Sequence, residues 1–297
     1  MSMTKAGIFA IVGRPNVGKS TLTNALVGEK VAIVSKKPQT TRNRIVGVVN
    51  RGQTQFVLMD TPGLHTPKSR LGDYMVKVVK ESVSDVDGIL LLVEPIANVG
   101  APEQQLIDRI KAMKAPAILV INKVDTVAKE ALLEVISTYS AAHEFQAILP
   151  ISARKGDGLG ELLDLLEPFA PEGPQLYPDG QISDQPERQM MAEIVREKLL
   201  TCLDKEIPHG TAVEVTKFSE RDSEIIDLDV TIYCEKASHK GIIIGKNGAM
   251  LKKIGAMARE DAERFMGTKI FLQTWVKVKE NWRDSSSLIR NFGYKDQ

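Results

Sequence analysis

The sequence predicts a doubly wound, mostly parallel α/β sheet followed by a smaller α+β domain. Up to about residue 170, short apolar runs alternate with segments of helical periodicity. A span rich in proline and glycine follows, and beyond it two strand-like segments precede a helix and a last strand. Alternating strands and helices favour a parallel sheet with helices on both faces. A chain of 297 residues is long enough for two domains of ordinary size.

Composition excludes several classes of protein. Hydrophobic residues make up 43% of the chain and charged residues 26%, which is typical of a globular protein, and the net charge of +1 excludes a globally basic one. Cys202 and Cys234 are too few for a disulfide framework. The start of the chain lacks the apolar core of a signal peptide, and runs such as residues 89–93 have the length of strands. We therefore expect a cytoplasmic protein. Separately, we expect a monomer.

The first half alternates expected strands and helices. The strands are residues 8–12, 45–49, 55–59, 88–93, 117–121 and 147–151, and the helices are residues 21–26, 71–82, 103–113, 129–141 and 159–169. Residues 28–44 show little periodicity and are expected to be a loop. The second and third strands flank a short turn, which predicts a hairpin. Residues 88–93 and 117–121 are continuously apolar, as in strands buried on both faces of a parallel sheet.

A glycine-rich loop joins the first strand to the first helix. It consists of Gly13, Arg14, Pro15, Asn16, Val17, Gly18, Lys19 and Ser20. The glycines let successive N–H groups point inward, Lys19 can reach the β- and γ-phosphates, and the Ser20 hydroxyl can ligate Mg²⁺. This pattern indicates a nucleoside-triphosphate site. Alone, it could also be a turn before an ordinary helix.

A second polar motif follows the strand at residues 55–59. It consists of Asp60, Thr61, Pro62 and Gly63. A carboxylate at the end of a strand can hold a Mg²⁺-bound water, and the N–H of a glycine can approach the terminal phosphate. The pattern is weak by itself because turns are rich in Asp and Gly.

Two further motifs follow the next strands and concern the base. They are Asn122, Lys123, Val124 and Asp125 after residues 117–121, and Ser152 and Ala153 after residues 147–151. The Asp125 carboxylate can accept from N1–H and the exocyclic amino group of guanine, which adenine does not offer. We expect Asn122 to brace the loops, the Lys123 stem to cover the base and the Ala153 N–H to donate to O6. Such a site rejects adenine by roughly 10⁴-fold, because its buried polar groups would stay unpaired.

These motifs occur in the order found in one family. Residues 7–170 resemble a translation-factor-type P-loop GTPase domain, whose second motif would be Thr40-Thr41. The resemblance implies GTP or GDP and Mg²⁺ as cofactors, with Thr41, or alternatively Thr40, as a Mg²⁺ ligand. The expected metal ligands are thus Ser20, Thr41 and Asp60, the expected catalytic residues are Lys19, Thr41 and Gly63, and Thr21 and Leu64 complete the expected nucleotide site.

The position after Gly63 predicts the rate of hydrolysis. Ras-like enzymes carry a water-orienting Gln there, whereas this chain has Leu64, which cannot orient water by hydrogen bonding. We therefore expect slow intrinsic turnover that a partner accelerates. His65 is expected to be a solvated loop residue rather than a general base.

The sequence divides into two domains at a proline-rich span. Seven Pro and Gly residues crowd residues 168–186, which predicts a linker. The expected division is residues 1–170, 171–187 and 188–297. Beyond the linker we expect a helix at 188–203, strands at 211–218 and 226–235 joined by a turn at 219–223, a loop at 241–248, a helix at 249–265, a strand at 269–279 and a tail helix at 282–289. Alternating apolar residues predict that the strand at 226–235 is half-buried.

This order resembles a type II KH domain, in which a Gly-x-x-Gly loop clamps a single-stranded nucleic acid. Side-chain-free glycines let phosphates approach the N–H groups at the start of a helix. Residues 236–253 contain five Lys and no acid, whereas residues 214–235 contain seven acids. The expected RNA-binding residues are Lys240, Ile243, Ile244, Gly245, Lys246, Asn247, Gly248 and Lys252. Phe271 and Trp275 are expected either to stack on bases or to pack against the tail helix.

The whole chain is similar to bacterial GTPases that join these two domains. The resemblance implies a GTP-regulated factor that binds the 3′ end of 16S rRNA, assists maturation of the small (30S) ribosomal subunit and associates peripherally with the inner face of the cell membrane. Two alternatives remain at this stage. One is a nucleotide kinase, and the other is a GTP-dependent scaffold, or a membrane or cell-cycle signalling switch, whose KH-like domain binds a protein.

Overall fold

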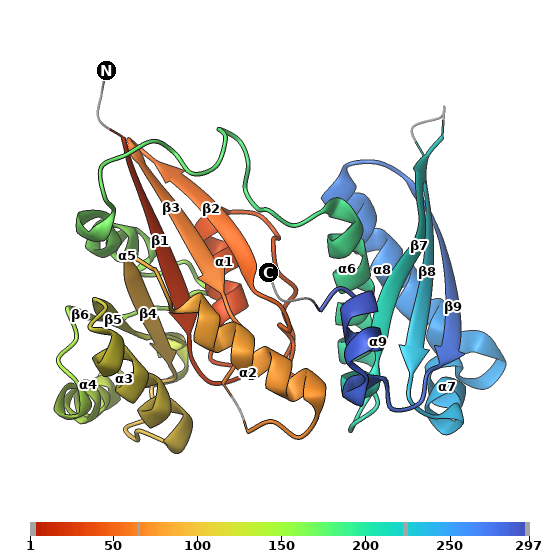
Figure 1. Ribbon diagram of the computed structural model, residues 1–297, viewed down its shortest axis with the longest axis horizontal. Helices are drawn as coiled ribbons and strands as arrows, with labels where there is room; N and C mark the ends of the chain where they lie inside the picture. Colours follow the sequence, from red (N-terminus) through yellow and green to blue (C-terminus); the bar gives the residue numbers. More distant parts are fainter. Residues whose placement is uncertain (1–3, 65, 222–224, 295–297) are drawn as a thin grey trace. The chain divides into compact units, whose positions relative to one another are not determined.

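The computed structural model describes residues 4–64, 66–221 and 225–294. The chain forms two compact units (Figure 1). The first comprises Met1–Ala32, Thr41–Pro67 and Tyr74–Asp184, and the second comprises Ile33–Thr40, Lys68–Asp73 and Gln185–Gln297. Met1, Ser2, His65 and part of the predicted turn at 219–223 lie outside the described residues.

The first unit is built on a six-stranded sheet of order β2-β3-β1-β4-β5-β6. Its strands are β1 (Lys5–Val12), β2 (Ile45–Arg51), β3 (Thr54–Asp60), β4 (Gly88–Val93), β5 (Ala117–Ile121) and β6 (Ala147–Pro150). Only the β2–β3 pair is antiparallel, so the predicted hairpin is present, and the other described pairs are parallel. The carboxyl ends of β1, β3, β4 and β5, with the polar motifs that follow them, therefore meet at one edge of the sheet.

Helices cover both faces of this sheet, which confirms the doubly wound architecture. The helices are α1 (Lys19–Val27), α2 (Arg70–Ser82), α3 (Ala101–Met113), α4 (Ala131–Ala142) and α5 (Leu159–Leu166). One hydrophobic cluster packs α2, α3 and α4 against one face, and a second packs α1 and α5 against the other. Because both faces are covered, the central strands are apolar throughout.

The proline-rich span after α5 is hydrogen-bonded to the first unit. The Gly173 N–H donates to the Thr4 carbonyl at 2.9 Å, and the Val48 N–H of edge strand β2 donates to the Ile182 carbonyl at 2.9 Å. The Gln55 side chain accepts from the N–H of Tyr177. Residues 171–184 thus run along this unit as an ordered strap.

The second unit contains a three-stranded sheet of order β7-β8-β9. Its elements are α6 (Glu187–Cys202), β7 (Ala212–Glu220), β8 (Ile226–Cys234), α7 (Ala237–Ile244), α8 (Ala249–Met266), β9 (Ile270–Val278) and α9 (Ser286–Asn291). β7 is antiparallel to β8, and β9 is parallel to it. Helices α6 and α8 pack side by side on one face of the sheet and enclose its core (Figure 1). This order of elements confirms the predicted KH fold.

Three local expectations were wrong. Residues 241–244, expected to belong to the loop at 241–248, are instead the second half of helix α7 (Ala237–Ile244). β8 is buried along nearly its whole length, because as the central strand it also has Asp227, Thr231 and Tyr233 covered on its second face. The tail helix at 282–289 is instead a short 3₁₀ turn, Trp282–Asp284, followed by α9, which Ser285 caps by accepting from the Leu288 N–H.

No helix in the described part of the chain combines the length and the apolar character needed to cross a membrane.

Candidate nucleotide site and RNA groove

The phosphate loop packs so closely that two of its glycines cannot be replaced without movement. A Cβ atom on Gly13 would lie 2.4 Å from the Leu92 carbonyl oxygen, and one on Gly18 would lie 2.3 Å from Asn122 Nδ2. Gly18 also has a φ of +104°, in the left-handed region that favours glycine. The loop is therefore fixed against the end of β4 and the loop that follows β5.

Lys19 is held inside this loop. Its Nζ donates to the carbonyl oxygens of Gly13 and Arg14 at 3.1 and 3.0 Å. Burial lowers the pKa of Lys19 to about 8, although the nearby charge of Asp60 opposes this shift. An anionic phosphate beside Lys19 would favour its charged form and relieve part of this cost.

Three oxygen-bearing side chains converge next to Lys19. Ser20 Oγ donates to Asp60 Oδ2 at 2.6 Å and lies 2.8 Å from Thr41 Oγ1. The Thr40 hydroxyl instead donates to the Lys37 carbonyl at 2.7 Å, so of the two candidate threonines Thr41 is the one beside Ser20.

The donor set suits Mg²⁺. Asp60 is fully buried, and its Oδ1 has no hydrogen-bond partner among the described residues. Burial raises the pKa of Asp60 to about 6, against the opposing effects of Lys19 and Ser20. Mg²⁺ prefers a few protein oxygens completed by water and phosphate oxygens. The described residues offer no group of three or more His, Cys, Asp or Glu for a metal, so a cation here would need those additional oxygens.

Gly63 lies against the phosphate loop. A Cβ on Gly63 would come within 2.6 Å of the backbone nitrogen of Pro15, so a larger residue would push the two loops apart. The next N–H, of Leu64, donates to the Gly13 carbonyl at 3.2 Å, and the Leu64 side chain packs on the hydrophobic cluster. This packing agrees with a residue that does not orient water.

The base-recognition motifs are joined to each other and to the phosphate loop. Asn122 Nδ2 donates to the Val17 carbonyl at 2.8 Å, and Asn122 Oδ1 accepts from the Ala153 N–H at 3.0 Å. A bond from Ala153 to O6 would therefore share this N–H with Asn122. Ser152 Oγ donates to Asp125 Oδ1 at 2.7 Å, and this bond chiefly holds the pKa of Asp125 below its ordinary value. The Asp125 carboxylate is thus kept as an ionised acceptor.

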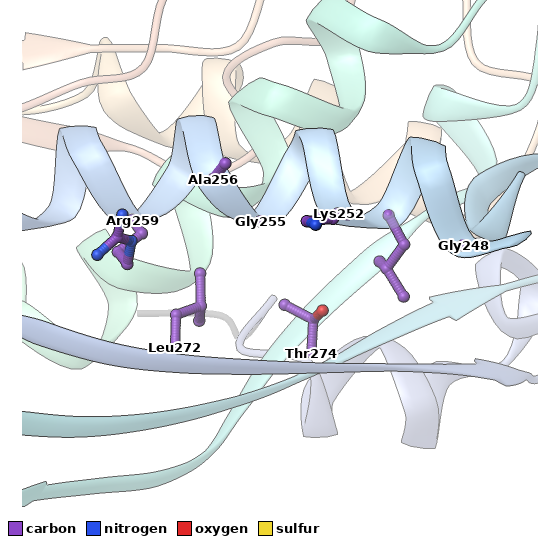
Figure 2. A pocket seen from close by; sticks show the side chains of 8 residues that line it. Gly248, Lys252, Gly255, Ala256, Arg259, Leu272 and Thr274 are labelled. Carbon is purple, nitrogen blue, oxygen red and sulfur yellow. The ribbon is translucent and has the colours of Figure 1, made fainter.

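The second unit carries a groove of about 410 Å³ between α8 and β9. Gly248 and small residues of α8 form one wall, and Leu272 and Thr274 point up from β9 toward the helix (Figure 2). Lys252 and Arg259 also line the groove. A groove with an apolar floor and cationic side chains can hold bases while it neutralises phosphates.

The Gly-x-x-Gly loop lies at one end of this groove. Gly245 and Gly248 have φ values of +73° and +77°, and Asn247 between them has a φ of +51°. A Cβ on Gly245 would meet Met250 Cβ at 2.7 Å, whereas nothing lies within 4 Å of one on Gly248. Gly248 is also the N-cap of α8, so the open side of this turn gives a phosphate access to the helix N-terminus.

Burial differs among the residues that were considered for RNA contacts. Ile243 is 0% exposed and packs in the core of the second unit, so its side chain is not at the surface, and its part in RNA binding stays a prediction. Phe271 and Trp275 are 48% and 43% exposed, so both keep surface open to a ligand, as stacking on bases would require. The tail is anchored by Trp282, whose Nε1 donates to the Gly210 carbonyl at 2.9 Å.

Sequence reasoning missed several residues of these sites. Arg259, Leu272 and Thr274 line the groove, but nothing in their spacing separates them from ordinary surface residues. Glu94, directly after β4, forms ion pairs with both Arg14 and Lys123. Its place after a central strand of the sheet could have marked it as a candidate site residue, but no motif predicts its ion-pair partners.

Comparison with known proteins agrees with a GTPase domain followed by a KH domain. A model of the family described as 50S ribosome-binding GTPase matches residues 8–123, and a KH-domain model matches residues 206–283. GTPase Era of Ruminiclostridium cellulolyticum is 52% identical over 98% of both chains. This chain belongs to the Era family of GTPases. Era of Clostridioides difficile is 50% identical over 99% of this chain and 100% of its own.

Two solved Era structures are similar to the whole chain. A variant of Aquifex aeolicus Era bound to GDP and AlF₄⁻ has a TM-score of 0.95 at 38% identity and covers 99% of this chain and 100% of its own. The second structure, of Era in complex with MgGDPNP and nucleotides 1506–1542 of 16S ribosomal RNA, has the same TM-score, identity and coverage. The Era family thus binds guanine nucleotides and Mg²⁺.

Proposed function

We propose that this Era-family GTPase is a Mg²⁺-dependent switch that binds single-stranded 16S rRNA and assists maturation of the small ribosomal subunit. We divide it into a P-loop GTPase domain at residues 1–170, a linker at 171–187 and a type II KH domain with a C-terminal helix at 188–297. The observation that carries the RNA-binding function is the groove between α8 and β9, which ends at the Gly-x-x-Gly turn. The solved complex of Era with 16S rRNA supports the same target.

In the nucleotide site, the residues of this chain bind and neutralise the triphosphate. Lys19 and the N–H groups of the phosphate loop would balance phosphate charge, and the Gly63 N–H would donate to the terminal phosphate. Ser20, Thr41 and Asp60 would hold Mg²⁺, which would supply positive charge to stabilise the phosphate oxygens. Leu64 supplies no hydrogen bond to the attacking water, so hydrolysis is slow until a partner contributes one.

Guanine recognition depends on Asp125. Its carboxylate, oriented by Ser152 at 2.7 Å, accepts from the N1–H and amino group of guanine. Adenine would leave that carboxylate unpaired, which disfavours ATP. A nucleotide kinase has no need of this motif, so the geometry supports a guanine-specific switch instead.

The segment that precedes Thr41 couples the bound nucleotide, GTP or GDP, to the KH domain. Residues 33–40 belong to the second unit, in which Arg196 of α6 donates to the Thr40 carbonyl and Glu197 accepts from the Val34 N–H at 2.9 Å. When Thr41 ligates Mg²⁺, Thr40 is held beside it, and these bonds to α6 favour one arrangement of the segment. Hydrolysis frees Thr41, changes this segment and releases the RNA.

We place this activity in the cytoplasm, where ribosomal subunits are assembled, with peripheral contact at the inner face of the cell membrane. The membrane contact rests on the resemblance to the family. Co-sedimentation with anionic lipid vesicles tests it, because a peripheral protein pellets with vesicles at low salt and is released by high salt.

The experiment that tests the proposed function is Gly248→Asp. The new side chain has open space around it, so despite the strain that a φ of +77° puts on any side chain the KH fold should persist, but its carboxylate would repel RNA phosphates. We expect binding of a 16S rRNA 3′-end fragment to fall by at least 100-fold in a gel-shift assay while GTP hydrolysis stays within twofold of wild type. Gly267→Asp, at the far end of α8 with a similar φ of +68°, is the matched control and should bind RNA normally. Equal RNA binding by Gly248→Asp and wild type would contradict the proposal.

A further inference from the structure

A chain of four charged side chains joins the phosphate loop to the loop that carries Lys123. The two carboxylate oxygens of Glu94 accept from different cations, Oε2 from Arg14 Nη2 at 2.5 Å and Oε1 from Lys123 Nζ at 2.6 Å. Arg14 Nε also lies 3.4 Å from Glu103 Oε1. Lys123 Nζ in turn donates to the Asn16 carbonyl in the phosphate loop at 2.6 Å.

Sheet topology puts Glu94 between the two loops. β4 lies between β1 and β5 in the sheet, and all three strands are parallel. A residue that directly follows β4 therefore lies between the phosphate loop after β1 and the base-recognition loop after β5. A single side chain at this position can reach both loops.

The electrostatics indicate that Glu94 is ionised and forms genuine ion pairs with Arg14 and Lys123, and that Glu103 pairs with Arg14, rather than making incidental surface contacts. Burial alone would raise the pKa of Glu94, but the hydrogen bonds from Lys123 and Arg14 outweigh it and hold that pKa below its ordinary value. Glu103, in the first turn of α3, has a side chain only 3% exposed. Among the described residues, its Oε2 has no hydrogen-bond partner, so the guanidinium of Arg14 is the cation that compensates its charge.

On the basis of the nucleotide site proposed above, we propose that Glu94 is a positioning residue for guanine-nucleotide binding: by holding Arg14 and Lys123 together, it fixes the phosphate loop against the base-recognition loop. Glu103 holds Arg14 from its other side. Glu94 does not line the position of the terminal phosphate, beside Lys19 and Asp60. It therefore slows nucleotide release and does not change the chemical step.

Nucleotide-release kinetics with a fluorescent GDP analogue test this role in the full-length protein. Glu94→Gln removes the charge but keeps the shape, and we expect GDP to dissociate about 5- to 30-fold faster, since hydrogen bonds to charged groups are strong. KM for GTP should rise by a similar factor while kcat at saturating GTP stays within twofold. Asp164→Asn is the matched control, because it breaks an exposed ion pair with Arg51 in the same unit and should change neither value.

Double-mutant cycles separate positioning from a general loss of structure. In a Lys123→Met or Arg14→Gln background, Glu94→Gln should increase the GDP dissociation rate by a factor at least threefold smaller than in wild type, because one of its partners is already gone. An equal cost in all three backgrounds would overturn the proposal, as would GDP release within twofold of wild type. Thermal unfolding without nucleotide shows whether each variant folds. If Glu94→Gln does not fold, the Arg14→Gln and Lys123→Met variants test the proposal in its place. Because both cations act through Glu94, the increase in the GDP dissociation rate in the double variant should be smaller than the product of the two single increases. Failure of the wild-type protein to bind GDP would instead refute the proposed function.

Discussion

Asp60→Asn should stabilise the nucleotide-free protein while abolishing Mg²⁺-dependent hydrolysis. Asp60 is fully buried, and its pKa is raised from 3.8 to about 6. A raised carboxyl pKa means that the folded state holds its proton more tightly than the unfolded state. Folding stability therefore falls as pH rises from about 3.8 to about 6, and the full penalty is present above that range.

The magnitude follows from the shift. Roughly two pKa units correspond to about 3 kcal/mol at 1.36 kcal/mol per unit. The pKa of about 6 already includes the opposing attraction of Lys19, so asparagine, which carries no charge, should gain up to about 3 kcal/mol at pH 7. At pH 4.5 the folded carboxyl is protonated while most unfolded carboxyls are still ionised, so the gain should fall to about 1 kcal/mol.

Urea denaturation of nucleotide-free protein, followed by far-UV circular dichroism at pH 7 and pH 4.5, measures this difference. Trp275 and Trp282 are the chain's two tryptophans and both lie in the second unit, so their fluorescence provides an internal control that Asp60→Asn should leave unchanged. GTP hydrolysis in Mg²⁺ should drop at least 100-fold in the same variant. An Asp60→Asn protein that is less stable than wild type at pH 7, or a gain of equal size at both pH values, would refute the reasoning.

Three further predictions concern single side chains. Asn122→Ala leaves the Val17 carbonyl and the Ala153 N–H buried without Asn122, so it should destabilise the first unit by about 2–4 kcal/mol in urea denaturation, and a loss below about 0.5 kcal/mol would argue against the bracing role. Asp125→Asn replaces a carboxylate acceptor with an amide, so GTP affinity should fall at least 100-fold. Xanthosine triphosphate, which has an oxygen in place of the amino group of guanine, should bind the variant better than it binds wild type. Unchanged GTP binding in calorimetry would exclude Asp125 as the guanine contact. Ile243→Ala should destabilise the second unit by about 2–4 kcal/mol, whereas Ile242→Ala, at a side chain 49% exposed, should cost less than about 0.5 kcal/mol, and equal losses would contradict the assigned burial.

The sequence predicted the first unit well because its signals are local. Strands such as β4 and β5 are continuous apolar runs, and each polar motif comes directly after a strand. In a parallel sheet the ends of these strands must meet, so order along the chain was enough to predict that Ser20, Asp60 and Asn122 lie at the same edge.

Helix α7 was missed because its local signals oppose a helix. It contains Gly241 and three consecutive β-branched residues, Ile242 to Ile244, which favour strands. Only Ile243 of the three is buried, and its packing in the core of the second unit overrides the low helix propensity. Tertiary contacts of this kind leave no periodic pattern in eight residues.

Contacts made through loops were also beyond the sequence. Glu94 and Glu103 form no recognisable motif, because their ion pairs depend on how the loops after β1, β4 and β5 curl. The strap at residues 171–184 was predicted as a linker from composition alone. Its backbone hydrogen bonds to Thr4 and to β2 could not be predicted, because they depend on β2 being an edge strand with unpaired N–H and C=O groups.

The affinity for RNA in two nucleotide states tests the central claim most directly. The probe is an RNA equivalent to nucleotides 1506–1542 of 16S rRNA, the fragment bound in the solved Era complex. With the wild-type protein, fluorescence anisotropy should show binding about tenfold tighter with a non-hydrolysable GTP analogue and Mg²⁺ than with GDP, a coupling of about 1.4 kcal/mol. Affinities equal within twofold in the two states would contradict the account, because a nucleotide can shift RNA binding only by its own differential affinity for the two conformations.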